Sequence, residues 1–206
     1  MLTSLLNNPL SAITFLCAVV VAITVHEFAH AWAATRLGDP LPESQGRLTL
    51  SPLAHLDPVG SLAFLIAGFG WGKPVQYNPN ALGRRTDELV IALAGPFSNL
   101  CTALLFNLLT TALVQAPSLQ HASQVGSIFA TVNVTLAAFN ILPFPPLDGS
   151  SIVAYFYPGY RSGRAAMIGG FALIILIVLV PGALGLLINP LIAGATWLTT
   201  LGGNLH

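Results

Sequence analysis

The chain alternates long apolar runs with shorter polar segments. A helix that crosses a membrane needs about 20 mostly apolar residues. Five runs approach or exceed this length, at residues 11–36, 89–114, 125–142, 165–180 and 183–201. The first three are each predicted to cross a membrane as a helix.

The last two runs are separated by Pro181 and Gly182. They can form a tight hairpin of two spanning helices, or one broken span followed by a tail at the membrane surface. We favour the hairpin, which brings the total to about five transmembrane helices.

Residues 59–70 form an apolar stretch that is too short to cross, so it is predicted to be re-entrant or interfacial. The sequences SQGRLTLSPL and GWGKPVQYNP flank this stretch and are rich in Gly, Pro and β-forming residues. We therefore expect short strands and turns here, arranged as a short β-hairpin or re-entrant segment on the cytosolic side.

The composition supports a membrane protein. Only 7% of the 206 residues are charged, against about 25% in soluble domains, and 54% are hydrophobic. The mean hydropathy is +0.77. So few charges cannot cover a soluble surface, so the expected fold class is an all-α polytopic membrane protein embedded in the lipid bilayer. The net charge of zero gives no indication of a nucleic-acid partner.

The positive charges predict an orientation. All seven Lys and Arg residues lie in two loops, one between the first and second runs and one between the third and fourth. Residues 115–124 carry none. Cytosolic loops are enriched in Lys and Arg, so both basic loops are predicted to face the cytosol. The N-terminus is then outside, and the membrane is predicted to be the cell membrane.

The first run ends in the sequence VHEFAHAWAATR, in which the motif HEFAH contains His26, Glu27 and His30. Residues four apart share one face of a helix, so the two histidines can bind one metal ion. Glu27 is placed to take a proton from a metal-activated water. Ionisable residues inside a span are costly and by default mark a functional site.

A catalytic zinc site needs a third protein ligand. His121 lies in the loop predicted outside, which excludes it. Asp148 follows the third run on the cytosolic side, where the HEFAH run also ends. His55 and Asp57 could reach the histidines if their loop folds back, and spacing alone leaves these alternatives open. The full set of remaining candidates is Glu43, His55, Asp57, Asp87, Glu88 and Asp148.

HEFAH in a transmembrane run, followed by NILPFPPLDG, resembles the site-2 protease family of intramembrane zinc metalloproteases. The second string fits the family pattern N-x-x-P-x-x-x-L-D-G from Asn140 to Gly149. GRLTLSPLAHLDPVG, FGWGKPVQYNP and AGPFSN are similar to segments of its compact prokaryotic-type members. The resemblance covers roughly residues 21–149.

This resemblance implies a ligand set and roles. His26, His30 and Asp148 would bind one Zn²⁺ per chain, and Glu27 would be the catalytic acid/base. Asn140 would contact the substrate backbone or the reacting carbonyl.

Two further polar residues have supporting roles in this hypothesis. Asn99, in the second run, is expected to form a hydrogen bond between helices. His55 is expected to be a structural group beside the site and not a ligand.

The predicted function is hydrolysis of peptide bonds within or near transmembrane segments of single-pass or short membrane proteins, as in regulated intramembrane proteolysis. The chain is predicted to be one domain, with a catalytic core at about 11–149 and C-terminal helices at about 165–201. No polar run is long enough for a PDZ or CBS domain, so selectivity would come from the core or from a separate regulatory membrane protein. The alternative is a zinc-binding membrane protein or transporter without proteolytic activity. A transporter typically shows repeated halves, and the sequence shows no repeat.

Overall fold

The computed structural model describes residues 9–67, 71–114, 117–158, 160, 164–180 and 182–200. The described residues are mostly helical, and none of them forms a strand. In chain order the elements are α2 (Pro9–Arg36), α3 (Leu41–Ser44), α4 (Pro52–His55), α5 (Pro58–Ala67), η1 (Pro79–Ala81), α6 (Arg85–Val114), η2 (Pro117–Leu119), α7 (Gln120–Asn140), α8 (Asp148–Phe156), α9 (Arg164–Leu179) and α10 (Ala183–Thr199).

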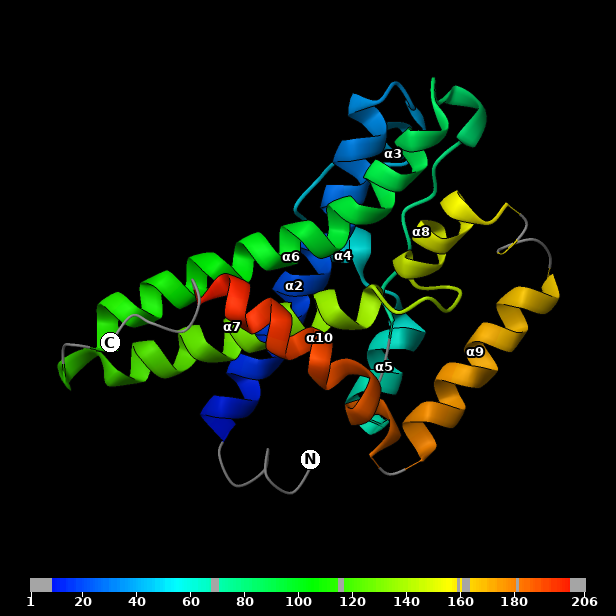
Figure 1. Cartoon of the computed structure of the whole chain (residues 1–206). Helices are drawn as coiled ribbons and strands as arrows, with labels where there is room; N and C mark the ends of the chain where they lie inside the picture. Colours follow the sequence, from blue (N-terminus) through cyan, green and yellow to red (C-terminus); the bar gives the residue numbers. More distant parts are fainter. Residues whose placement is uncertain are drawn as a thin grey trace.

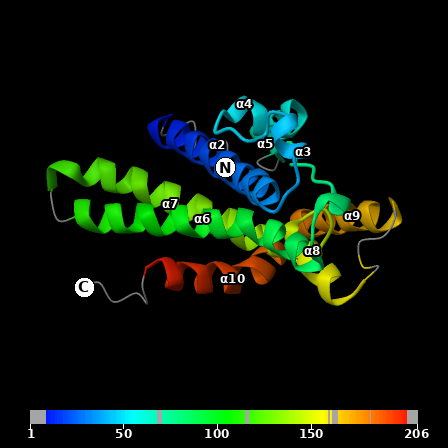
Figure 2. The same cartoon turned by 90° about the horizontal axis from the view of Figure 1, so that it is seen from above.

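Three of these helices, α2, α6 and α7, are long and apolar enough to cross a membrane. They correspond to the first three predicted runs. The helices α6 and α7 run antiparallel side by side, and α2 crosses them (Figure 1). Seen from above, the α6–α7 pair lies between α2 on one side and α10 on the other (Figure 2). The protein is therefore an all-α integral membrane protein.

Small side chains lie where the long helices meet. Lipid tails are as apolar as leucine, so helices in a membrane associate through close packing of small residues. Large apolar side chains such as Phe97 and Leu105 instead face outward. The buried alanines of the three long helices are Ala18, Ala22, Ala31, Ala33, Ala34, Ala92, Ala103, Ala130, Ala137 and Ala138.

The two C-terminal runs form two separate helices of 16 and 17 residues, α9 and α10. Between them Gly182 has a φ of +82°, a conformation that favours glycine. The helix α10 packs on α6 and α7, whereas α9 stands apart from the long helices (Figures 1 and 2). A cluster formed by Leu142, Leu147, Ile174 and Ile188 joins both helices to the segment that precedes α8.

The loop between α2 and α6 differs from its prediction. The predicted β-hairpin is absent from the described residues, where the pairing consists of one antiparallel bridge between Leu56 and Gly72. Prolines explain the difference. Pro52 and Pro58 start the short helices α4 and α5, and Pro74 has no N–H with which to extend the ladder.

The short apolar stretch predicted at residues 59–70 is helical where it is described. It forms most of α5, which has 10 residues and is too short to cross a bilayer. Residues 68–70 lie outside the described residues.

Adjacent glycines on α9 test how this helix docks. A Cβ atom added to Gly170 would lie 2.1 Å from the carbonyl oxygen of Pro145, whereas one added to Gly169 would meet nothing within 4 Å. We expect Gly170→Ala to destabilise the protein by about 1–3 kcal/mol through overpacking. Gly169→Ala is the matched control and should be neutral or stabilising by up to about 1 kcal/mol. Thermal unfolding of both variants in detergent measures the difference, and equal shifts would contradict this packing of α9.

Candidate metal centre

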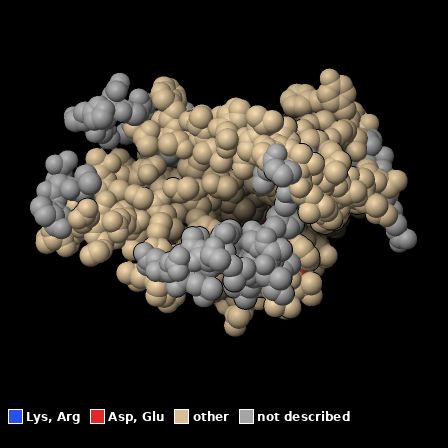
Figure 3. Space-filling model, turned by 90° about the horizontal axis from the view of Figure 1, so that it is seen from below, with Lys and Arg blue, Asp and Glu red and all other residues tan. Residues whose placement is uncertain are grey.

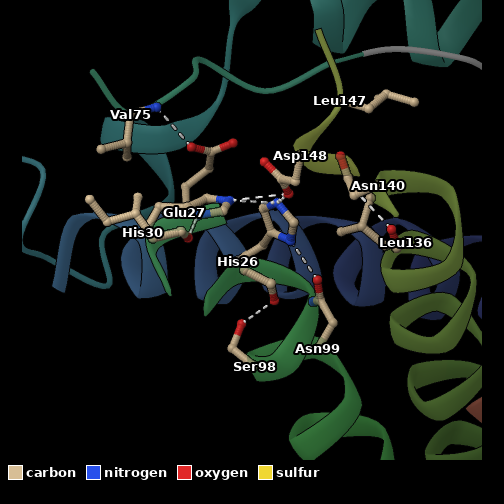
Figure 4. Close-up of polar contacts among 12 residues, drawn as sticks. His26, Glu27, His30, Val75, Ser98, Asn99, Leu136, Asn140, Leu147 and Asp148 are labelled. Carbon is tan, nitrogen blue, oxygen red and sulfur yellow. Dashed lines mark hydrogen bonds and ion pairs between the residues drawn. The ribbon is translucent and has the colours of Figure 1, made fainter. Parts of the chain in front are cut away.

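His26 and His30 lie on the C-terminal half of α2, where it crosses α6. One helical turn separates them, and both side chains are buried, with 5% and 7% exposure. Their Nε2 atoms approach to 3.0 Å, and their rings meet edge to face. The predicted pairing of these two side chains is therefore present in the structure (Figure 4).

The partners of the outer ring nitrogens define the state of both rings. His26 Nδ1 lies 2.7 Å from Asn99 Oδ1, and His30 Nδ1 lies 2.7 Å from the carbonyl oxygen of Ile91. Both partners only accept hydrogen bonds, so each histidine must donate from Nδ1. In the neutral rings the Nε2 atoms are then unprotonated and direct their lone pairs inward.

Asp148, at the first residue of α8, completes the cluster. Its Oδ2 atom lies 3.1 Å from His26 Nε2 and 3.3 Å from His30 Nε2. This oxygen is buried and accepts no hydrogen bond from any protein donor. When both rings are neutral and protonated at Nδ1, three electron-pair donors therefore converge at this point.

Such a cluster fits a cation. Zinc bonds of about 2.0–2.1 Å in a tetrahedral arrangement place neighbouring ligand atoms about 3.3 Å apart. The separations among the three ligand atoms here are 3.0, 3.1 and 3.3 Å. Two imidazoles and one carboxylate are also a typical donor set for catalytic zinc.

Backbone packing places Asp148. Ser150 lies just beyond it, and both its amide and its hydroxyl donate to the carbonyl oxygen of Leu147. A Cβ atom on Gly149 would lie 2.0 Å from the carbonyl oxygen of Ile141, so this position must be glycine. The start of α8 can then fold tightly against the end of α7. This contact gives a physical reason for the Asp-Gly pair in the sequence.

Gly95 on α6 provides space for the two imidazoles. An added Cβ atom would lie 2.4 Å from His30 Nε2 and 2.7 Å from His26 Nε2. Sequence reasoning assigned no role to this residue, although it lies within AGPFSN. An isolated glycine inside an apolar helical run often marks a position of close packing, and this was the feature of the sequence that could have indicated the role of Gly95.

Glu27 lies beside the cluster and is held by the loop between α2 and α6. Its Oε2 atom accepts a hydrogen bond of 2.9 Å from the backbone N–H of Val75 (Figure 4). No sequence signal could reveal this contact, because any residue except proline supplies the same N–H.

Two buried charged residues hold the segment that carries Val75. Arg47, which is 3% exposed, donates to the carbonyl oxygens of Ala54 and Lys73. Asp39, which is 1% exposed, accepts a 2.6 Å hydrogen bond from the N–H of Asn78. Burial lowers the pKa of the Arg47 guanidinium, while the negative charge of Glu27 opposes this shift.

The other predicted residues lie around the centre. Asn99 is fully buried and links α6 to α2, because its Nδ2 atom donates to the carbonyl oxygen of Ala22. His55 is fully buried and donates from Nε2 to the carbonyl oxygen of Thr49, so it contacts the loop and not the cluster. Asn140 donates to Leu136, one turn back on its own helix, and lies near Asp148 (Figure 4).

Among the described residues, one group of three metal-ligating side chains is close enough to share an ion, and it consists of His26, His30 and Asp148. Of the third-ligand candidates from the sequence, Asp148 is thus the one brought to the two histidines. His55 and Asp57 are not part of this group.

Comparison with known proteins identifies the family. The pattern that defines peptidase family M50 matches residues 109–180. The "Putative zinc metalloprotease YwhC" of Bacillus subtilis is 36% identical over 188 residues, which cover 87% of this chain and 86% of that protein. The chain belongs to peptidase family M50. The family assignment confirms the resemblance to the site-2 proteases.

Two mycobacterial proteins are also similar. The "Putative zinc metalloprotease Rip2" of Mycolicibacterium smegmatis is 29% identical over 84% of this chain and 71% of its own length. The "Putative zinc metalloprotease Rip3" of Mycobacterium tuberculosis is 31% identical over 89% of this chain and 42% of its own length. No solved structure shows a significant match.

Substitution of Gly95 tests the close approach of the imidazoles to α6. Gly95→Ala must push His26 or His30 out of place, so we expect bound divalent metal to fall about tenfold or more. Gly194→Ala is the control, because a Cβ atom there meets nothing within 4 Å. Elemental analysis of the purified proteins measures the metal content. Unchanged content in Gly95→Ala would contradict the arrangement described here.

Proposed function

We propose that this chain is an intramembrane zinc metalloprotease that hydrolyses peptide bonds within or near transmembrane segments of other proteins. The observation that carries the proposal is the convergence of two imidazole nitrogens and one buried carboxylate oxygen on a single point inside a bundle of membrane-spanning helices. The names of the similar M50 proteins support zinc as the metal.

In this proposal His26, His30 and Asp148 hold the zinc ion. When bound, zinc would activate a water molecule and polarise the scissile carbonyl. Glu27 takes the proton of the attacking water at its carboxylate and delivers it to the leaving amine. The Val75 N–H engages one carboxylate oxygen of Glu27 and leaves the other for this transfer.

Asn140 and Asn99 support the reaction in different ways. Asn140 lies near Asp148 at the end of α7, so a substrate that displaces its hydrogen bond to Leu136 could take its amide as a backbone partner. Asn99 acts through the ring of His26, whose Nδ1 proton it accepts. His55 is a structural group that helps to shape the loop between α2 and α6.

The proposed orientation places the N-terminus outside and the metal centre toward the cytosol of a cell membrane. Lys73, Arg47 and Arg84 lie in the loop between α2 and α6. Arg36 and Arg85 lie at the ends of α2 and α6 that border this loop, and these helix ends lie at the top of Figure 1. The opposite face shows no Lys or Arg among its described residues (Figure 3). This separation of charge supports the positive-inside assignment.

The two C-terminal helices are proposed to cross as a hairpin. Their 16 and 17 residues correspond to about 24–26 Å, close to the lower limit for a span. The chain then has about five transmembrane helices in a single domain, with its catalytic core at residues 11–149. We expect substrates to be single-pass or short membrane proteins, selected by this core or by a separate regulatory membrane protein.

A non-proteolytic zinc protein or transporter is the alternative function. The position of Glu27 disfavours it, because a carboxylate beside two metal ligands serves proton transfer and is not needed for binding alone.

Replacing Glu27 tests the proteolytic function. Glu27→Gln removes the acid/base but no ligand, so we expect cleavage of a reconstituted single-span test substrate to fall about 100-fold or more while bound zinc is retained. Glu43→Gln, at an exposed acidic residue on α3, is the matched control and should cleave normally. Retained activity in Glu27→Gln would remove this residue from the mechanism.

Cysteine labelling tests the orientation. In a background with Cys17 and Cys101 replaced by alanine, Ser118→Cys should react with an impermeant thiol reagent applied from outside. Asn80→Cys should react only after the membrane is opened. Both positions are exposed in the structure, so the membrane alone decides their access. The reverse labelling pattern would invert the topology.

A further inference from the structure

Asn133 is a fully buried amide in the middle of α7, a helix that is long enough to cross the membrane. Burying a polar side chain at such a position is costly unless each of its groups finds a partner. Its Nδ2 atom donates to the carbonyl oxygen of Phe129, four residues earlier, over 2.9 Å. Its Oδ1 atom accepts from Nδ2 of Asn99 on α6, also over 2.9 Å.

These bonds form a directed chain from α7 to the metal centre. The carbonyl of Phe129 can only accept, so it makes Asn133 present its oxygen to α6. Asn99 must then present its NH₂ group to Asn133 and to the carbonyl of Ala22, which leaves its oxygen for His26. His26 in turn donates from Nδ1 to that oxygen.

The direction of this chain matters for metal binding. If the Asn99 amide flipped, its oxygen would face the oxygens of Asn133 and Ala22, and its NH₂ group would face His26. His26 would then have to accept at Nδ1 and carry its proton on Nε2, the atom that faces His30 and Asp148. In that tautomer Nε2 carries a proton and has no lone pair with which to bind the metal.

We infer that Asn133 is a positioning residue of the metal centre, which orients the Asn99 amide and thereby keeps the Nε2 lone pair of His26 available to the ion. The inference rests on the proposed zinc-binding function. It adds a contribution from α7, because Asn133 contacts the metal ligand His26 only through Asn99. Partners that orient metal-binding histidines typically change metal affinity 10- to 100-fold when they are removed.

Zinc affinity of the purified full-length protein, measured by competition with a chelator, tests the inference. Asn133→Leu removes the acceptor for Asn99, so we expect a 10- to 100-fold weaker affinity. Asn107→Leu is the matched control. It removes an amide from α6 about two helical turns beyond Asn99, and its zinc affinity should match the wild type.

A double variant separates positioning from packing. In Asn99→Asp both carboxylate oxygens accept, so His26 can donate from Nδ1 whichever way the side chain turns. We therefore expect Asn133→Leu to change zinc affinity by about twofold or less in the Asn99→Asp background. An equal loss in both backgrounds, or no loss in either, overturns the inference, because Asn133 would then act only through packing or not at all.

Two measurements keep the outcomes distinct. Thermal unfolding of the zinc-free proteins reports any loss of folding, and Asn133→Ala replaces Asn133→Leu in the same cycle if the larger side chain is not accommodated. The wild type is titrated first. Failure of the wild type to bind zinc would refute the proposed function itself, whereas normal binding together with an unaffected Asn133 variant would refute this inference alone.

Discussion

The main constraint on this structure is that three electron-pair donors, which repel one another, are held close together in the interior. Two imidazole nitrogens and a carboxylate oxygen lie 3.0–3.3 Å apart, and Asp148 Oδ2 accepts no hydrogen bond from a protein donor. In a low-dielectric interior such a cluster is unfavourable until a cation is shared among its members. The surrounding helices hold the three atoms in this arrangement, so part of the cost of assembling the site is met by the fold and not by the metal.

Each surrounding element contributes something that the cluster cannot supply. The helix α6 contributes the bare backbone of Gly95 and an acceptor for each histidine, namely Asn99 Oδ1 and the carbonyl of Ile91. The tight contact of Gly149 with the end of α7 sets the carboxylate of Asp148 at the start of α8. The loop between α2 and α6 holds Glu27. The metal centre is thus built from α2, α6, the start of α8 and the loop between α2 and α6, and no single one of these segments could form it.

Parts of this arrangement could be predicted from the sequence. Hydrophobic length located the three long helices, although α6 begins at Arg85 and α7 at Gln120, before the apolar runs start. A capped first turn explains the early start of α6, because the side chain of Asp87 accepts a hydrogen bond from the N–H of Arg84. The i, i+4 spacing identified His26 and His30. Spacing could not select Asp148 over His55 and Asp57, because that choice depends on which loop folds back. The predicted β-hairpin is not found among the described residues, where Pro52 and Pro58 start short helices that β-forming composition alone does not reveal.

The contact between Val75 and Glu27 has a consequence for how this protein can vary. The group that engages the carboxylate is a peptide N–H, which every amino acid but proline carries. The contact therefore depends on the path of the backbone and not on the identity of residue 75. Arg47 and Asp39 fix this path through their hydrogen bonds to the backbone of Lys73 and Asn78. An alanine scan across this segment would leave the hydrogen bond in place and would report position 75 as unimportant. Any residue other than proline at this position can therefore supply the same N–H to Glu27.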